Sequence, residues 1–155
     1  MVNFYPGYVS QASANWDADV AAENARFNAP PFAGLYLGQP ERAKVAMDNW
    51  LKDHPQPKVT VSMVADHIDH IRQIAGVDSA GIGSDFDGIP AGPDGLEGVD
   101  KYPKLFEELA RRGWTDNDLA KLADGNILRV LRAAQGVAKR LQADERASTM
   151  EFIKP

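Results

Sequence analysis

Residues 80–88 read Ala80-Gly81-Ile82-Gly83-Ser84-Asp85-Phe86-Asp87-Gly88. The pattern predicts a short apolar strand that ends abruptly at two carboxylates and a glycine. Its glycines carry no side chain, so the backbone can lie close to a neighbouring strand or a ligand. Barrel and open-sheet α/β enzymes place catalytic groups at the carboxyl ends of their strands. Asp85 is therefore the first candidate for a functional residue.

The composition sets broad limits on the function. The 155 residues are enough for one domain with a sizeable core. The formal net charge of -5 argues against nucleic acid or an anionic membrane as the partner. No apolar run approaches the ~18 residues that span a bilayer. The chain has no cysteine, which excludes disulfides and thiolate metal sites.

A second strand is predicted at residues 2–5, where the turn pair Pro6-Gly7 ends it. A long crossover that includes helices separates it from the strand at residues 80–84, so the two should lie parallel. Parallel strands need cover on both faces, and a two-stranded sheet is marginal by itself. We therefore expect either association with another copy or, as the favoured interpretation, a piece of a larger parallel-sheet protein.

Several helices are expected between and after the strands. The clearest covers residues 60–75, where apolar residues recur at three- and four-residue steps between Thr60 as N-cap and Gly76 as stop. Residues 115–118 resemble a capping box. Residues 124–126 are expected to separate the last helix from the one before it. The apolar stripe of that last helix is interpreted as part of the core, as are Tyr102 and Trp114. The other helices are expected at residues 16–28, 41–53, 101–112, 115–123 and 127–141.

Asp85 and Asp87 allow more than one interpretation. They could form a paired carboxylate site, or Asp87 could organise an Asx turn before Gly88. A calcium loop fails, because its fifth and twelfth positions would be Ile89 and Leu96, neither of them an acidic ligand.

The helix at residues 60–75 carries the motif D-H-I-D-H, from Asp66 to His70. Two histidines three residues apart on a helix can share a metal ion. The motif lacks the glutamate of a zincin, however. The favoured interpretation is that His67 hydrogen-bonds a neighbouring element while His70 faces solvent. His54, in a loop between prolines, is an even weaker metal candidate.

Several motifs in one order resemble the membrane (renal) dipeptidase family of zinc metallopeptidases. The first three are Met1-Val2-Asn3-Phe4-Tyr5, Val64-Ala65-Asp66-His67-Ile68-Asp69-His70-Ile71 and Gly81-Ile82-Gly83-Ser84-Asp85-Phe86-Asp87-Gly88. The resemblance continues in Gly95-Leu96-Glu97, Lys101-Tyr102-Pro103 and Asn126-Ile127-Leu128-Arg129-Val130. It covers most of the chain and is least diagnostic over residues 14–58.

The resemblance implies an α/β fold: the C-terminal part of a (β/α)8 TIM-like barrel, with the last two strands, the crossover and the C-terminal helices. Such a part is incomplete as a barrel on its own, and Met1 is then an internal residue of a longer protein. The implied single partial domain, 1–155, divides into strand seven and its turn at 1–10, an insertion or helical crossover at 11–58, a helix at 59–76, strand eight and the active-site loop at 79–88, the C-terminal helices at 99–142 and a loose tail at 143–155.

The resemblance also implies the chemistry. In this family two zinc ions at the barrel mouth activate a bridging water, which attacks the peptide carbonyl of a dipeptide. Asp85 matches the aspartate that follows the last strand; its implied role is to bind the attacking water, take its proton and pass it to the leaving amine. Tyr8 and Gly88 match positions that line the substrate pocket. His67 and His70 match no metal ligand.

The chain departs from the family at the metal site. The family's zinc ligands are a histidine–aspartate pair, a bridging glutamate and two later histidines, all in the portion that precedes Met1. The arginine that binds the substrate carboxylate lies there as well. The resemblance therefore predicts no zinc ligand within this chain, and a polypeptide that is inactive alone.

Three functions remain open at this stage. The leading one is the C-terminal fragment of a zinc-dependent dipeptidase, partnered by its dipeptide substrate and by the missing N-terminal part of the barrel. The alternative is a non-catalytic assembly module that pairs its exposed strands with itself or another chain. A third, weaker one is a small complete hydrolase built on Asp85 and Asp87.

Overall fold

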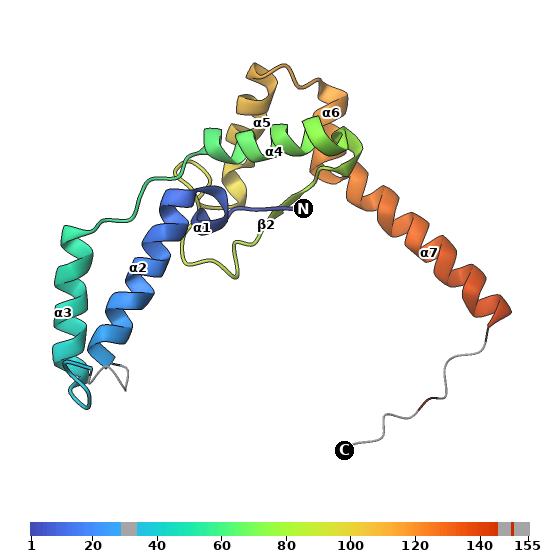
Figure 1. The fold of residues 1–155 in the computed structure, drawn as a ribbon. Coiled ribbons are helices and arrows are strands. Elements are labelled where there is room, and N and C mark those ends of the chain that lie inside the picture. The colour runs from blue at the N-terminus through green and yellow to red at the C-terminus, as the bar shows by residue number, and fades with distance from the viewer. Residues whose placement is uncertain (29–33, 146–149, 151–155) are drawn as a thin grey trace.

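The structure, a computed structural model, describes residues 1–28, 34–145 and 150. Helices make up most of this part of the chain (Figure 1). The α-helices are α1 (Pro6–Val9), α2 (Gln11–Asn28), α3 (Pro40–Asp53), α4 (Val61–Ala75), α5 (Tyr102–Arg111), α6 (Asp116–Ala120) and α7 (Asn126–Asp144). Shorter helical segments are the 3-10 turns η1 (Val77–Ser79) and η2 (Val99–Lys101) and the π-helical turn η3 (Lys121–Gly125).

The sheet has two strands, β1 (Val2–Asn3) and β2 (Ile82–Ser84). They pair in parallel, which confirms the prediction made from the long crossover between them. The ladder includes a hydrogen bond of 2.7 Å from Val2 N to Gly81 O. Across the described ranges this sheet does not close into a barrel.

Helix α4 is the element that the sequence predicted best. Thr60 occupies the N-cap position, although its hydroxyl makes no capping hydrogen bond, and Gly76 ends the helix with φ of +81°. That left-handed conformation is open to glycine at no steric cost, which explains the stop. The buried residues of α4 are Val64, Ala65 and Ile68, all on the predicted apolar stripe.

Three predicted boundaries were wrong. Pro6 and Gly7 do not simply turn the chain but begin α1, because proline is tolerated in the first turn of a helix. Helix α2 begins before residue 16, at Gln11. Residues 124–126 do not interrupt the last helix either, since Gly125 and Asn126 both have right-handed helical dihedral angles.

Tertiary hydrogen bonds explain the last of these corrections. Asn126 is buried, and its Nδ2 group donates at 2.8 Å to the carbonyl oxygens of both Val77 and Ala80. The side chain therefore anchors the start of α7 to the segment that leads into β2. Its amide is not free to bond its own backbone and break the helix.

The core lies where the sheet meets α4 and α5. Its fully buried members include Phe4, Val64, Ile68, Leu105 and Leu109. Trp114 belongs to this core, as predicted, while Tyr102 is only half-buried and packs against it. The predicted capping box at the start of α6 is confirmed by reciprocal hydrogen bonds between Thr115 and Asp118.

Helix α7 contradicts the prediction that its apolar stripe is core. Figure 1 shows the helix extending away from the body of the molecule after its first turn. The exposed fractions of its large apolar side chains lie between 37% and 51%, in Ile127, Leu128, Val130, Leu131, Val137 and Leu141. The stripe has the pattern of a buried face, but none of the described elements covers it. The predicted loose tail at 143–155 lies mostly outside the described residues, and α7 itself reaches Asp144.

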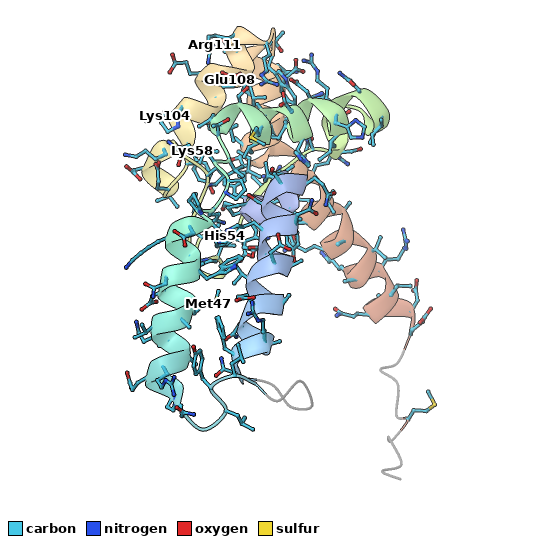
Figure 2. The ribbon with its side chains drawn as sticks, turned by 60° about the vertical axis from the view of Figure 1, so that its left-hand side comes forward. Met47, His54, Lys58, Lys104, Glu108 and Arg111 are labelled. Carbon is cyan, nitrogen blue, oxygen red and sulfur yellow. The ribbon has the colours of Figure 1, made fainter. Side chains whose placement is uncertain are left out.

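Helices α2 and α3 form a second projection, running side by side away from the body (Figures 1 and 2). Near the body they are joined by a hydrogen bond of 2.7 Å from Trp16 Nε1 to the carbonyl oxygen of His54, which Figure 2 labels at the end of α3. No described helix combines the length and the hydropathy that crossing a bilayer requires.

Candidate functional site

The three predicted site residues lie around one hollow. Tyr8 comes from α1, which follows β1, and Asp85 and Gly88 come from the loop that follows β2. The hollow has a volume of about 290 Å³ and is lined by Tyr5, Tyr8, Asp85, Gly88, Ile89 and Pro90. A larger hollow of about 390 Å³ lies along α3, but none of the predicted site residues lines it. The site therefore lies at the carboxyl ends of both strands.

The backbone turns sharply where β2 ends. Ser84 and Asp85 have φ of +44° and +76°, in the left-handed region that residues other than glycine rarely adopt. A residue in this conformation costs on the order of 1–3 kcal/mol of backbone strain, and such strained residues cluster at active sites and ligand clamps. Asp85 N donates to Gly83 O at 2.6 Å, and the Ser84 and Tyr102 hydroxyls lie 2.8 Å apart. These contacts hold the turn that takes Asp85 out of the line of the strand.

Asp87 does not take part in this arrangement. The turn after Asp85 is closed by the backbone of Gly88, whose N–H donates to the carbonyl oxygen of Asp85 at 2.9 Å. The Asp87 side chain is exposed and does not line the hollow. Both the paired-carboxylate interpretation and the Asx turn at Asp87 were therefore wrong.

Asn3 is the residue of this region that the sequence analysis missed. Its Nδ2 donates to Asp85 Oδ2 at 2.9 Å, and its Oδ1 accepts a hydrogen bond of 2.7 Å from Tyr5 N. The pairing register places Asn3 opposite Ser84, one residue before Asp85. The sequence did contain a signal for Asn3. The carboxyl ends of two parallel strands meet at the same edge of a sheet, and Asn3 is a polar residue at such an end.

Gly88 owes its identity to close packing. A Cβ atom at this position would lie 2.5 Å from Asp85 Oδ1 and 3.1 Å from Asp85 Cγ. No other residue fits there unless the carboxylate moves. Asn3 thus contacts one oxygen of the Asp85 carboxylate, and the absent side chain of Gly88 leaves room for the other.

Two tyrosines form the opposite wall. The rings of Tyr5 and Tyr8 pack edge to face with centroids 5.2 Å apart. Tyr5 Oη donates to Asp17 Oδ2 at 2.8 Å, and this hydrogen bond, together with burial, raises the pKa of Tyr5. Tyr8 remains 71% exposed and is free to contact a ligand.

The histidines lie as the favoured interpretation predicted. His67 Nε2 is 2.9 Å from the carbonyl oxygen of Val9, so His67 links α4 to the end of α1. His70 is exposed. His54 stacks on Trp50 with ring centroids 4.3 Å apart. Among residues 1–28, 34–145 and 150, no three histidine, aspartate or glutamate side chains come together in a group that could hold a metal ion.

The aspartates of the D-H-I-D-H motif bind Arg112, a partner that the sequence analysis missed. The Arg112 guanidinium lies 2.7 Å from Asp66 and 2.9 Å from Asp69, and its Nε lies 2.8 Å from Glu108. Figure 2 labels Glu108 and Arg111 on α5, which packs beside α4. Burial lowers the pKa of Arg112, but the hydrogen bonds that its guanidinium donates to Asp69, Asp66 and Glu108 outweigh burial, and the net shift is upward. This network holds α4 against α5 and has no contact with the hollow.

Comparison with known proteins identifies the family. Residues 1–145 match the family described as membrane dipeptidase (peptidase family M19). The chain belongs to this family, which confirms the resemblance seen in its motifs.

Individual relatives agree with this assignment. The chain is 49% identical to Dipeptidase 3 of Rattus norvegicus over 80 residues, which cover 52% of this chain and 16% of that protein. It is 47% identical to Dipeptidase 3 of Macaca fascicularis over 83 residues, covering 54% and 17%. The crystal structure of the probable dipeptidase PvdM from Pseudomonas aeruginosa matches with a TM-score of 0.57 and 29% identity, covering 82% of this chain and 34% of that one. The matched part is thus about a third of the solved structure and under a fifth of the curated relatives.

Proposed function

We propose that this chain is the C-terminal part of a zinc-dependent dipeptidase, with β1 and β2 as the last two strands of a (β/α)8 barrel. The observation that carries the proposal is the gathering of Tyr8, Asp85 and Gly88 around one hollow at the carboxyl ends of two parallel strands. That edge is where barrel enzymes place their active sites. The proposed substrate is a dipeptide, in keeping with the description of the family as membrane dipeptidases.

Asp85 is the proposed catalytic residue of this chain. It binds the attacking water, takes its proton and passes that proton to the leaving amine. Tyr8 and Gly88 form substrate-contacting walls on either side. Zinc, when bound in the family, supplies the activation of the water. The described residues of this chain do not fit a zinc site by themselves, and by the family resemblance the ligands belong to the preceding part of the barrel.

The exposed surfaces of the chain support a barrel that other polypeptide completes. A hollow of about 280 Å³ lies between the segment that leads into β2 and the first turns of α7; its lining includes Ala80, Gly81, Ile127 and Val130. The apolar face of α7 continues from there. A strand paired beside β2 and a helix packed on α7 would cover both, in the layered arrangement that parallel sheets require.

The test uses a completed barrel, meaning this chain joined behind the preceding barrel segment of a family member. We expect zinc-dependent dipeptide hydrolysis, and a loss of kcat of about 10²–10⁴-fold in Asp85→Asn, because the general base is removed. Asp87→Asn is the matched control, since the Asp87 side chain is exposed and does not line the hollow. Full activity in Asp85→Asn would overturn the proposed role of Asp85.

The same exposed face of α7 favours one other function, a non-catalytic assembly module. In that case the isolated chain pairs its strands and α7 with a second copy. Size-exclusion chromatography and near-UV circular dichroism of the isolated chain separate the two functions. A molten or aggregated species supports the barrel proposal, and a defined oligomer with native near-UV signal supports assembly.

A further inference from the structure

We infer that Asn3 is a positioning residue that sets the orientation of the Asp85 carboxylate, an inference that rests on the proposed function. Asn3 ends β1, and Asp85 directly follows β2. The two are 82 positions apart in the chain, yet their side chains meet at 2.9 Å. The parallel pairing brings them together, because Asn3 lies in register with Ser84.

The hydrogen bonds of Asn3 determine which way its amide faces. Tyr5 N is a donor only, so the Asn3 atom 2.7 Å from it must be the Oδ1 acceptor. The Nδ2 group then faces Asp85, where it donates to Oδ2. The Asn3 amide thus accepts a hydrogen bond from Tyr5 N at its oxygen and donates one to Asp85 at its nitrogen. These two partners are enough to define the orientation of the amide.

Asp85 needs this support because its side chain is exposed. Within the described part of the chain, its carboxylate accepts its side-chain hydrogen bond from Asn3. Asn3 holds Oδ2, and Oδ1 lies in the space that the absent Cβ of Gly88 leaves open. A general base must lie within hydrogen-bond reach of the proton that it takes, so holding the carboxylate in one orientation contributes directly to rate.

Asn3 also connects the two walls of the hollow. Its bond to Tyr5 N shapes the entry into α1, which carries Tyr8. A purely structural role would reside in this bond, and the positioning role resides in the bond to Asp85. The two roles can be separated by substitution, because each uses a different end of the amide.

The test compares Asn3→Asp with Asn3→Leu in the completed barrel. Asn3→Asp keeps the shape and the acceptor for Tyr5 N but replaces the donor with a second negative oxygen beside Asp85. We expect kcat to fall about 100-fold with KM changed less than about threefold, and a melting temperature close to that of the parent. Asn3→Leu loses both bonds, so we expect a similar fall in kcat together with a lower melting temperature. Asn117→Asp, the same charge change at an exposed position of α6, is the control and should change neither.

Asp85→Asn, measured in parallel, separates the positioning role of Asn3 from the catalytic role of Asp85. If Asp85→Asn is inactive while Asn3→Asp keeps its kcat, the positioning role is wrong and the proposed function stands. If both variants keep full activity, the proposed catalytic role of Asp85 is wrong as well. Absence of zinc-dependent turnover in the parent barrel would overturn the proposed function itself. A fall in activity of Asn3→Asp that appears only in KM, or only together with loss of folding, would also overturn the positioning role.

Discussion

Asp69 accepts a hydrogen bond of 2.7 Å from the indole Nε1–H of Trp114. Its other carboxylate oxygen lies 2.9 Å from the Arg112 guanidinium, so one side chain of α4 accepts hydrogen bonds from two residues that follow α5. Trp114 is 4% exposed. The D-H-I-D-H motif is thus explained by helix packing, without a metal ion.

Replacing Asp69 tests this explanation. Asp69→Ala leaves the Trp114 N–H and part of Arg112 without their acceptor, and we expect a loss of about 2–3 kcal/mol in the free energy of unfolding. Urea denaturation of the completed barrel measures it. His70→Ala, at the next and exposed position of α4, is the matched control and should cost less than about 0.5 kcal/mol. Equal losses in the two variants would contradict the explanation.

The bond between His67 and the Val9 carbonyl gives a second prediction. His67→Ala removes a hydrogen bond between α4 and the end of α1, which should cost about 1 kcal/mol of stability. Because the contact is structural, the zinc content of the completed barrel, measured by elemental analysis after dialysis, should not change. Loss of zinc in this variant would show that His67 is a ligand.

Gly88 allows a direct steric test of the site. In Gly88→Ala the new Cβ would meet Asp85 Oδ1, so the carboxylate must move and kcat should fall on the order of 10–100-fold. Gly136→Ala in α7 is the control, since a Cβ there meets nothing within 4 Å, and it should stabilise the helix by about 0.5–1 kcal/mol. An unchanged kcat in Gly88→Ala would mean that the position of the Asp85 carboxylate does not matter.

Acid should weaken the packing of α4 on α5. The hydrogen bond from Arg112, opposed by burial and supported by the charges of Arg111 and Arg112, lowers the pKa of Glu108 from its ordinary value of 4.5. A lowered pKa in the folded state means that the stabilisation is present above pH 4.5 and is lost as the pH falls through the folded-state value. We therefore expect Glu108→Gln to be less stable at pH 7 and to lose less stability than the parent as the pH falls below 4.5. Glu107→Gln, an exposed neighbour, should follow the parent, and an identical pH dependence in Glu108→Gln would contradict the assignment.

The sequence predicted what local pattern and chain connectivity determine. The spacing of Val64, Ala65 and Ile68 defined α4, and the long crossover determined that β1 and β2 lie parallel. Asp85 was named as a site residue from its place at the end of a strand, and Tyr8 and Gly88 through the family resemblance. The fold brings all three to one hollow. Their catalytic and binding roles remain predictions.

What the sequence did not predict depends on partners that are distant along the chain. Arg112 lies 46 positions after Asp66, and no local pattern pairs them. Asn126 extends a helix across Gly125 because its amide bonds carbonyls of a different segment. The apolar stripe of α7 was correctly recognised from the sequence. Such a stripe indicates that one face of the helix is suited to burial, but it does not show which element covers that face. Asn3 was missed because its role appears only once two strands lie side by side.

Under the proposed function, residues 1–145 act as a dipeptidase only as part of a complete barrel. The most direct measurement is dipeptide hydrolysis by the purified isolated chain in zinc-containing buffer, beside the completed barrel at equal concentration. We predict no turnover by the isolated chain and zinc-dependent turnover by the completed barrel. Zinc-dependent turnover by the isolated chain that disappears in Asp85→Asn would contradict this requirement for the rest of the barrel.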